Sequence, residues 1–158
     1  MRKGYTLIEI LISLTIISIL FGIGYVSFRD FSRRQAIQGA SKNIIGDLRL
    51  TQELALSGEK PSSLNCETSH SLNGYYFRVS VDGNSYSIEA FCTGGVVEKK
   101  TVNLAEGLSF STTSPNPILF KVLGEGTNIN GSYATITLNQ ENTENTVIVT
   151  VGKEGEIK

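Results

Sequence analysis

The chain has 158 residues, a formal net charge of -1 and 18% charged residues, a length that suits one folded unit with an appendage. Because the net charge is close to zero, the chain as a whole does not attract nucleic acid or acidic substrates electrostatically. Any electrostatic function must therefore depend on a local group of charges. Tryptophan is absent, and residues 59–158 are rich in Ser, Thr, Asn, Val and Ile, which favours short strands and turns.

The first predicted element is a long helix that contains an uncharged run. Residues 10–28 read ILISLTIISILFGIGYVSF, and at about 1.5 Å per residue this run makes about 28 Å of helix, close to the hydrocarbon thickness of a bilayer. We therefore expect it to span a membrane. The short leader before it favours an N-terminus in the cytoplasm. The positive-inside rule says little about the orientation here, because basic residues flank both ends of the run, at Arg2, Lys3 and Arg29.

The helix is expected to continue beyond the apolar run as an amphipathic segment, residues 29–57. Apolar or small side chains recur there at helical spacing, at Phe31, Ile37, Ala40, Ile44, Leu48, Thr51 and Ala55. Gly58 and Pro61 are stop signals. One helix from about Thr6 to Ser57 is therefore predicted.

Beyond Pro61 the period of the apolar residues becomes two, as in strands. Apolar and polar side chains alternate in residues 75–81 and 86–92, and Asp82-Gly83 between them is a hairpin turn signal. Further short strands are expected at 96–104, 107–112, 118–123, 133–139, 145–151 and 155–158. An antiparallel sheet must bury one face, and the helical stripe at 37–55 is available to cover it. The predicted fold class is therefore α+β, a long N-terminal helix packed on an antiparallel β-sheet domain.

The two cysteines, Cys66 and Cys92, lie in the β-rich half, without the paired spacing of a zinc site. A disulfide is the expected state. If the domain lies outside the cytoplasm, closing this loop contributes roughly 3 kcal/mol by the chain-entropy argument. The alternative is a pair of unrelated buried thiols.

The physically expensive residue of the N-terminal segment is Glu9, an ionisable side chain in an otherwise apolar helix. Such a group costs about 2.5–3.5 kcal/mol at the centre of a membrane helix, and less near its edge, so it normally has a partner. No basic side chain lies within helical reach. If the chain were cut after Gly4, the new amino group of Tyr5 would lie about 6 Å along the helix axis from Glu9, and the same group of a neighbouring subunit could neutralise it.

The short basic leader, Gly4, the aromatic Tyr5, the Thr6-Leu7-Ile8-Glu9 run and the long hydrophobic tract resemble the signal of type IV prepilins and type II secretion pseudopilins. This resemblance implies a pilin fold. It also implies that prepilin peptidase cuts between Gly4 and Tyr5, that the Tyr5 amine is then N-methylated, and that Glu9 sets the register of subunits during assembly. The alternative is a plain signal-anchor helix with an incidental glutamate.

A looser resemblance covers most of the chain. Residues 44–59 and the patterns at 118–124, 134–138 and 147–157 are similar to minor pseudopilins of the GspH/FimT type. This second likeness depends on strand patterning, which many unrelated domains share. Major pilins therefore remain an alternative.

The remaining titratable residues do not converge on a catalytic or metal centre, so we expect no enzyme, no cofactor and no metal. The single histidine, His70, lies between two serines in a polar segment and is expected to be a solvated loop residue, because sequence adjacency does not make a triad. Residues 141–145, Glu-Asn-Thr-Glu-Asn, could bind a cation weakly, but a solvated turn is favoured.

Nucleic-acid binding is also disfavoured, because residues 59–158 carry 7 basic against 11 acidic residues, whereas phosphate contacts need clustered Lys or Arg. Lys99-Lys100 is the small basic patch of this region. Arg29, Arg33 and Arg34 lie just outside the apolar run, where lipid headgroups or acidic residues of adjacent subunits are the expected partners.

The sequence thus predicts a leader at 1–4, a transmembrane and filament-core helix at 5–28, its amphipathic continuation at 29–57 and a β-rich domain at 58–158. The expected function is that of a structural subunit, a minor one, of a type IV pilus or secretion pseudopilus. The expected partners are prepilin peptidase, other pilin or pseudopilin subunits, the inner-membrane assembly platform and the bilayer. The expected location is the inner membrane, with the C-terminal domain outside the cytoplasm, and then the filament. The alternatives are a membrane-anchored binding domain that never polymerises and a DNA-uptake pilin.

Overall fold

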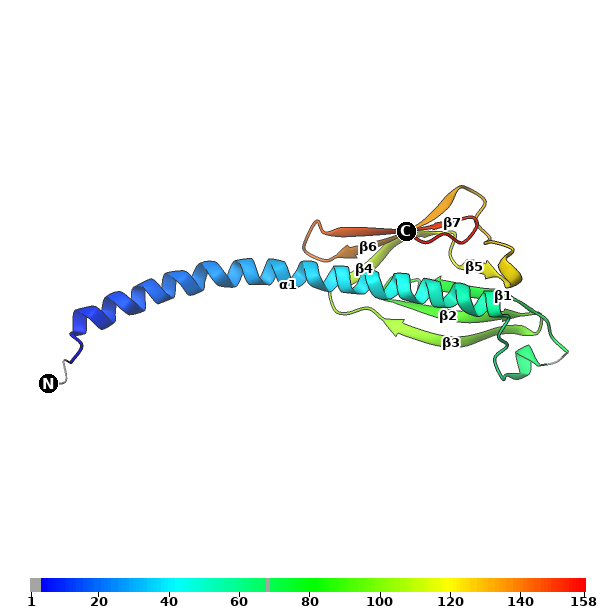
Figure 1. Ribbon diagram of the computed structural model, residues 1–158, viewed down its shortest axis with the longest axis horizontal. Coiled ribbons are helices and arrows are strands. Elements are labelled where there is room, and N and C mark those ends of the chain that lie inside the picture. The colour runs from blue at the N-terminus through cyan, green and yellow to red at the C-terminus, as the bar shows by residue number, and fades with distance from the viewer. Residues whose placement is uncertain (1–3, 68) are drawn as a thin grey trace. The chain divides into compact units, whose positions relative to one another are not determined.

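The computed structural model describes residues 4–67 and 69–158, without the side chains of residues 23–27 and Thr112. The chain divides into two compact units, one that ends at Ala36 and one that runs from Ile37 to Lys158. The predicted α+β class is confirmed, because a long N-terminal helix precedes seven described strands and packs on antiparallel sheets. Figure 1 shows the order of these elements.

The long helix, α1, spans Leu7–Ser57, within one residue of the predicted bounds. Thr6 begins it as a cap, since its Oγ1 and carbonyl oxygen both accept from the Glu9 amide, at 3.4 and 3.1 Å. Gly58 ends it: its N–H donates a hydrogen bond to the Ala55 carbonyl, and its φ of +64 is the left-handed conformation that glycine adopts most readily after a helix. The predicted cover of the sheet is confirmed in the second unit, where Ile44, Leu48 and neighbouring inward side chains of α1 are buried.

In the described part of the chain, seven strands form two antiparallel sheets rather than the single sheet that was expected. The first has the order β3-β2-β1-β5 and the second the order β4-β6-β7. The strands are β1 (Leu72–Val79), β2 (Ser85–Cys92), β3 (Gly95–Asn103), β4 (Leu108–Ser114), β5 (Ile118–Lys121), β6 (Tyr133–Gln140) and β7 (Thr146–Gly152). Alternation reveals strands but not their partners, so it did not predict that β5 pairs with β1 instead of with β4.

Two local predictions need correction. The β1–β2 hairpin is confirmed, but β1 ends at Val79 and the side chain of Val81 is fully exposed in the turn, because Gly83 with φ +71 and the bond from Ser80 to Asp82 close the turn earlier. The strand expected at 155–158 is reduced to a single bridge between Val151 and Ile157.

The core of the second unit lies between α1 and the inner faces of both sheets, beside which the cyan part of the helix runs in Figure 1. Alternate residues of β1, β2, β5 and β6 point inward, as the burial of Tyr75, Phe77 and Val79 on β1 shows. The Phe77 and Tyr86 rings stack across the hairpin with centroids 5.0 Å apart. Such a core fixes the second half of α1 on the sheets.

Gly74→Ala should destabilise this unit strongly. A Cβ at position 74 would overlap the Phe120 carbonyl oxygen of β5, which is backbone and cannot rotate away. We expect a loss of about 2 kcal/mol or more in the free energy of unfolding, measured by urea unfolding of the full-length protein in detergent. Gly131→Ala is the matched control, because a Cβ there meets open space. Equal stability of the two variants would contradict the close approach of β1 and β5.

Candidate processing and assembly site

The predicted cleavage site lies ahead of α1, in chain without regular secondary structure. Gly4 and Tyr5 are exposed, 79% of the Tyr5 side chain being accessible, and a Cβ on Gly4 would meet no atom within 4 Å. A peptidase needs an uncovered peptide bond outside a helix, because a helical bond cannot enter an active-site cleft without unwinding. Residues 1–3 of the expected leader lie outside the described part of the chain.

Glu9 lies in the first turn of α1, four residues after Tyr5, with its side chain exposed. A carboxylate there is favoured by the partial positive charge of the helix N-terminus. Within residues 4–67 and 69–158, none of the ion pairs includes Glu9. The carboxylate is therefore open to a cation supplied by a cut N-terminus or by another chain.

The helix after Glu9 presents apolar side chains around its whole circumference. Its hydroxyls bond to the backbone of the same helix, Ser13 to the Glu9 carbonyl and Ser18 to the Leu14 carbonyl, both at 2.8 Å. Among residues 7–21, the exposed large apolar side chains are Leu7, Ile8, Ile10, Leu11, Ile12, Leu14, Ile16, Ile17, Ile19, Leu20 and Phe21. A helix that is apolar on all sides is normally buried by other molecules.

Within the residues that the structure describes, no helix is long and apolar enough to cross a membrane. The expected span at 10–28 is therefore not confirmed. It includes residues 23–27, whose side chains lie outside the described part.

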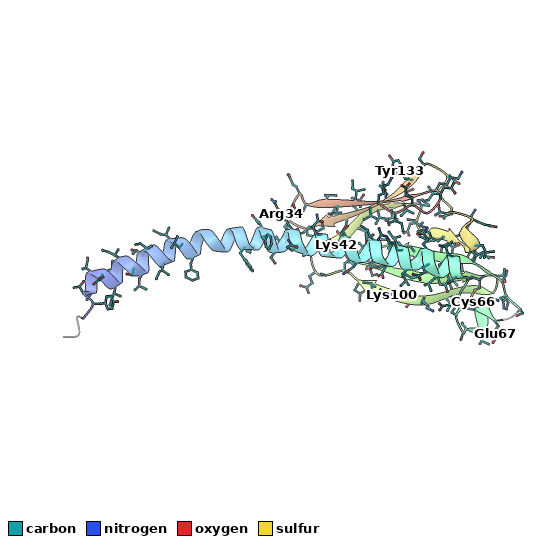
Figure 2. The ribbon with its side chains drawn as sticks, in the orientation of Figure 1. Arg34, Lys42, Cys66, Glu67, Lys100 and Tyr133 are labelled. Atoms are coloured by element: carbon teal, nitrogen blue, oxygen red, sulfur yellow. A yellow bond between two sulfur atoms is a disulfide. The ribbon has the colours of Figure 1, made fainter. Side chains whose placement is uncertain are left out.

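The predicted disulfide is present. Cys66, in the short helix η1 (Leu64–Cys66), is bonded to Cys92 at the end of β2, with 5.5 Å between their Cα atoms, and both side chains are buried. Figure 2 labels Cys66 at this junction. The bond ties the segment after α1 to the first sheet.

Loss of this disulfide should cost about 3 kcal/mol of unfolding free energy, because the cross-link closes a long loop and so restricts the unfolded chain. The double variant Cys66→Ser/Cys92→Ser should accordingly unfold at a lower urea concentration than the oxidised wild type. Reduction of the wild type should shift its transition by a similar amount. A reduced protein as stable as the oxidised one would contradict the assignment.

The small basic patch Lys99-Lys100 is engaged in ion pairs within the chain. Lys100 Nζ lies 2.7 and 2.9 Å from the two carboxylate oxygens of Asp47 on α1, and Lys99 Nζ lies 2.6 Å from Glu59. A register shift opposite Ile88 makes Lys99 an extra residue of β3, which lets two consecutive lysines reach carboxylates. Figure 2 shows Lys100 beside the helix. These pairs argue against phosphate binding by the patch.

Asp47 is the polar residue that the sequence reading missed. It lies on the buried face of α1 and also accepts a 2.8 Å hydrogen bond from the Tyr86 hydroxyl. Its burial could have been predicted from its position in the sequence, three residues after the inward Ile44 and next to the inward Leu48. A carboxylate inside an apolar stripe needs a buried partner.

Burial, and then the hydrogen bond to Asp47, raise the pKa of the Tyr86 hydroxyl above its ordinary value of 10.0. Because the pKa of Tyr86 is higher in the folded than in the unfolded chain, its protonated hydroxyl stabilises the fold. This contribution to the free energy of unfolding is complete below about pH 10 and is lost as the pH rises further. We expect the free energy of unfolding to fall between about pH 9 and about pH 11 less steeply in Tyr86→Phe than in the wild type. Urea unfolding across this range measures both slopes, and equal slopes would contradict the prediction.

The other residues considered from sequence do not form a site with one another. His70 lies in a loop and is partly exposed; its Nδ1 lies 3.2 Å from the Ser69 hydroxyl and its ring lies beside Gly94. The 141–145 loop forms a turn in which Thr143 and Asn145 bond to Gln140. No group of metal-binding side chains is found in the described part of the chain.

Comparison with known proteins finds one family at the N-terminus. The model of the prokaryotic N-terminal methylation motif matches residues 1–25. No curated protein and no solved structure matches the chain significantly. The chain thus carries the type IV pilin-like N-terminal signal, and the finding supports a pilin-like or pseudopilin subunit in general. Such proteins are structural rather than enzymatic.

Proposed function

We propose that this chain is a structural subunit of a type IV pilus or type II secretion pseudopilus. Prepilin peptidase cuts it between Gly4 and Tyr5, the Tyr5 amine is N-methylated, and the processed chain assembles into a filament through α1. The observation that carries this proposal is the coincidence of the methylation motif at residues 1–25 with a helix that is apolar on all its described sides.

The proposed assembly follows from the charges and surfaces of the N-terminal segment. Removal of the leader places a new cation about 6 Å along the axis from Glu9, and packing against neighbouring helices buries the exposed apolar side chains. Burial of apolar surface contributes about 25 cal/mol per Å². The neighbouring subunits, the inner-membrane assembly platform and the bilayer are the partners that this surface requires.

The proposal extends to location and subtype. Before assembly, residues 5–28 anchor the chain in the inner membrane with the globular unit outside the cytoplasm, where the Cys66–Cys92 disulfide persists. We further propose a minor subunit of the GspH/FimT type. Its support is a strand-rich domain of two sheets that follows the helix.

Co-expression with a prepilin peptidase, followed by intact-mass and N-terminal analysis, tests the processing step. We expect loss of Met1 to Gly4 and the addition of one methyl group to Tyr5. Gly4→Arg should block both, whereas the adjacent Lys3→Arg, which keeps the leader basic, should be processed like the wild type. An uncut wild-type chain would replace this proposal with a membrane-anchored binding domain that never polymerises.

A further inference from the structure

Tyr133 stands on the outer face of the second sheet with an unusually uncovered ring. Its neighbours along β6, Ala134, Ile136 and Leu138, point into the core, so the alternation of the strand turns Tyr133 outward, where 64% of it is exposed. Figure 2 labels it on this sheet. Among residues 4–67 and 69–158, no aromatic ring or cation stacks on it.

A hollow of about 350 Å³ opens beside this ring, lined by Ser132, Tyr133, Thr150, Gly152, Glu156 and Lys158. Its origin lies in the strand register, because Tyr133 pairs with Gly152 on β7. Glycine carries no cross-strand side chain that could cover the ring, and a Cβ at this position would lie 3.3 Å from the Glu156 Cβ. The volume lies within the ordinary range of small-molecule sites.

The chain segment after β7 fixes the polar rim of the hollow. The Thr150 amide donates a hydrogen bond to the Lys158 carbonyl at 2.8 Å, and the Lys158 amide donates one to the Thr150 carbonyl at 3.0 Å. The Gly152 amide donates to the Glu156 carbonyl at 2.7 Å. Ile157 between them packs on the core, so Glu156 and Lys158 point outward, where their side chains pair at 2.6 Å. A carboxylate, an ammonium and two hydroxyls therefore surround one aromatic face.

We propose that this hollow binds a β-linked glycan through one of its pyranose rings. A pyranose with equatorial hydroxyls has an apolar C–H face, which stacks on Tyr133, and a hydroxyl edge, which needs both donors and acceptors. Lys158 donates, Glu156 accepts, the Ser132 hydroxyl can do either, and the Thr150 hydroxyl, which donates to the Lys158 carbonyl at 3.4 Å, can accept. The side chains of the lining carry one positive and one negative charge, which pair with each other, and this disfavours a phosphate or a nucleic acid. This inference goes beyond the proposed function and does not rest on it.

The test is binding of cellotetraose and tetra-N-acetylchitotetraose to the full-length protein in a detergent without a sugar headgroup, because a glycosidic detergent would compete. Calorimetry gives the affinity, and saturation-transfer NMR identifies the bound ring. Tyr133→Ala should weaken binding at least about tenfold, while Tyr133→Phe, which keeps the ring, should bind within a few-fold of the wild type. Gly152→Leu should weaken binding to a similar degree by filling the hollow.

Ile148→Ala is the matched control, since Ile148 is an exposed residue of β7 outside the hollow. Its affinity should equal that of the wild type. If Gly152→Leu unfolds early, the Tyr133→Ala and Tyr133→Phe pair decides alone. No binding of either tetrasaccharide by the wild type, or unchanged binding by Tyr133→Ala, would overturn the proposal. Equal affinity for the α-linked maltotetraose would overturn the assignment to β-linked glycans.

Discussion

Glu9→Gln is expected to be cut and methylated like the wild type but to enter filaments at least about tenfold less efficiently. Glutamine keeps the size of the side chain and removes its charge, so the carboxylate can no longer pair with the Tyr5 amine of its own or a neighbouring subunit. Losing one member of a desolvated charge pair costs about 2–5 kcal/mol. The amount of the variant in purified filaments, relative to its amount in the membrane fraction, measures the effect.

Glu9→Asp is the control, because it keeps the charge one methylene shorter and should assemble better than Glu9→Gln. Ser13→Ala is a second control on the same helix, since its hydroxyl bonds only to the Glu9 carbonyl among the described residues. It should assemble like the wild type. Normal assembly of Glu9→Gln would remove the register role of Glu9.

Asp47→Ala is expected to destabilise the globular unit by about 1 to 3 kcal/mol, the cost of leaving the buried Tyr86 hydroxyl without its acceptor, because the Lys100 side chain is 44% exposed and can be hydrated. Asp47 holds both the Tyr86 hydroxyl, in the core, and Lys100 on the edge strand β3. Without it the Tyr86 hydroxyl is buried without its acceptor, and α1 loses its polar contact with this edge of the sheet. Urea unfolding of the full-length protein in detergent measures the loss.

Glu53→Ala is the matched control, an exposed carboxylate of the same helix, with an expected change within about 0.5 kcal/mol. The double variant Asp47→Ala/Tyr86→Phe should cost less than the sum of its two single variants, because removing both partners leaves no hydroxyl unpaired. Additive losses would mean that the bond between Asp47 and Tyr86 does not contribute to stability.

Local signals predicted α1 and the β1–β2 hairpin well. Gly58 ends the helix at the expected place, because the left-handed conformation that follows the last turn suits glycine. The alternation in residues 75–81 identified the first hairpin, although it extended β1 too far, to Val81. Both features depend on residues that are near one another in the chain, which is why the sequence could indicate them.

Long-range pairing could not be predicted in the same way. Division into two sheets depends on β5 pairing with β1, whose residues are some forty positions away, and alternation carries no information about partners. The pairing of Lys100 with Asp47 is likewise a contact between distant segments, and without it Lys99-Lys100 resembled a surface patch. The proposed processing site could be predicted from the sequence, since Gly4, Tyr5 and Glu9 lie within one short motif.

The measurement that tests the central claim most directly is the intact mass of this chain in filaments sheared from cells that also produce a pilus or pseudopilus assembly apparatus. The account predicts a chain that begins at Tyr5, carries one added methyl group and retains the Cys66–Cys92 disulfide, within the filament fraction. A chain that keeps Met1 to Gly4 and stays in the cell envelope, while other subunits form filaments without it, would contradict the account.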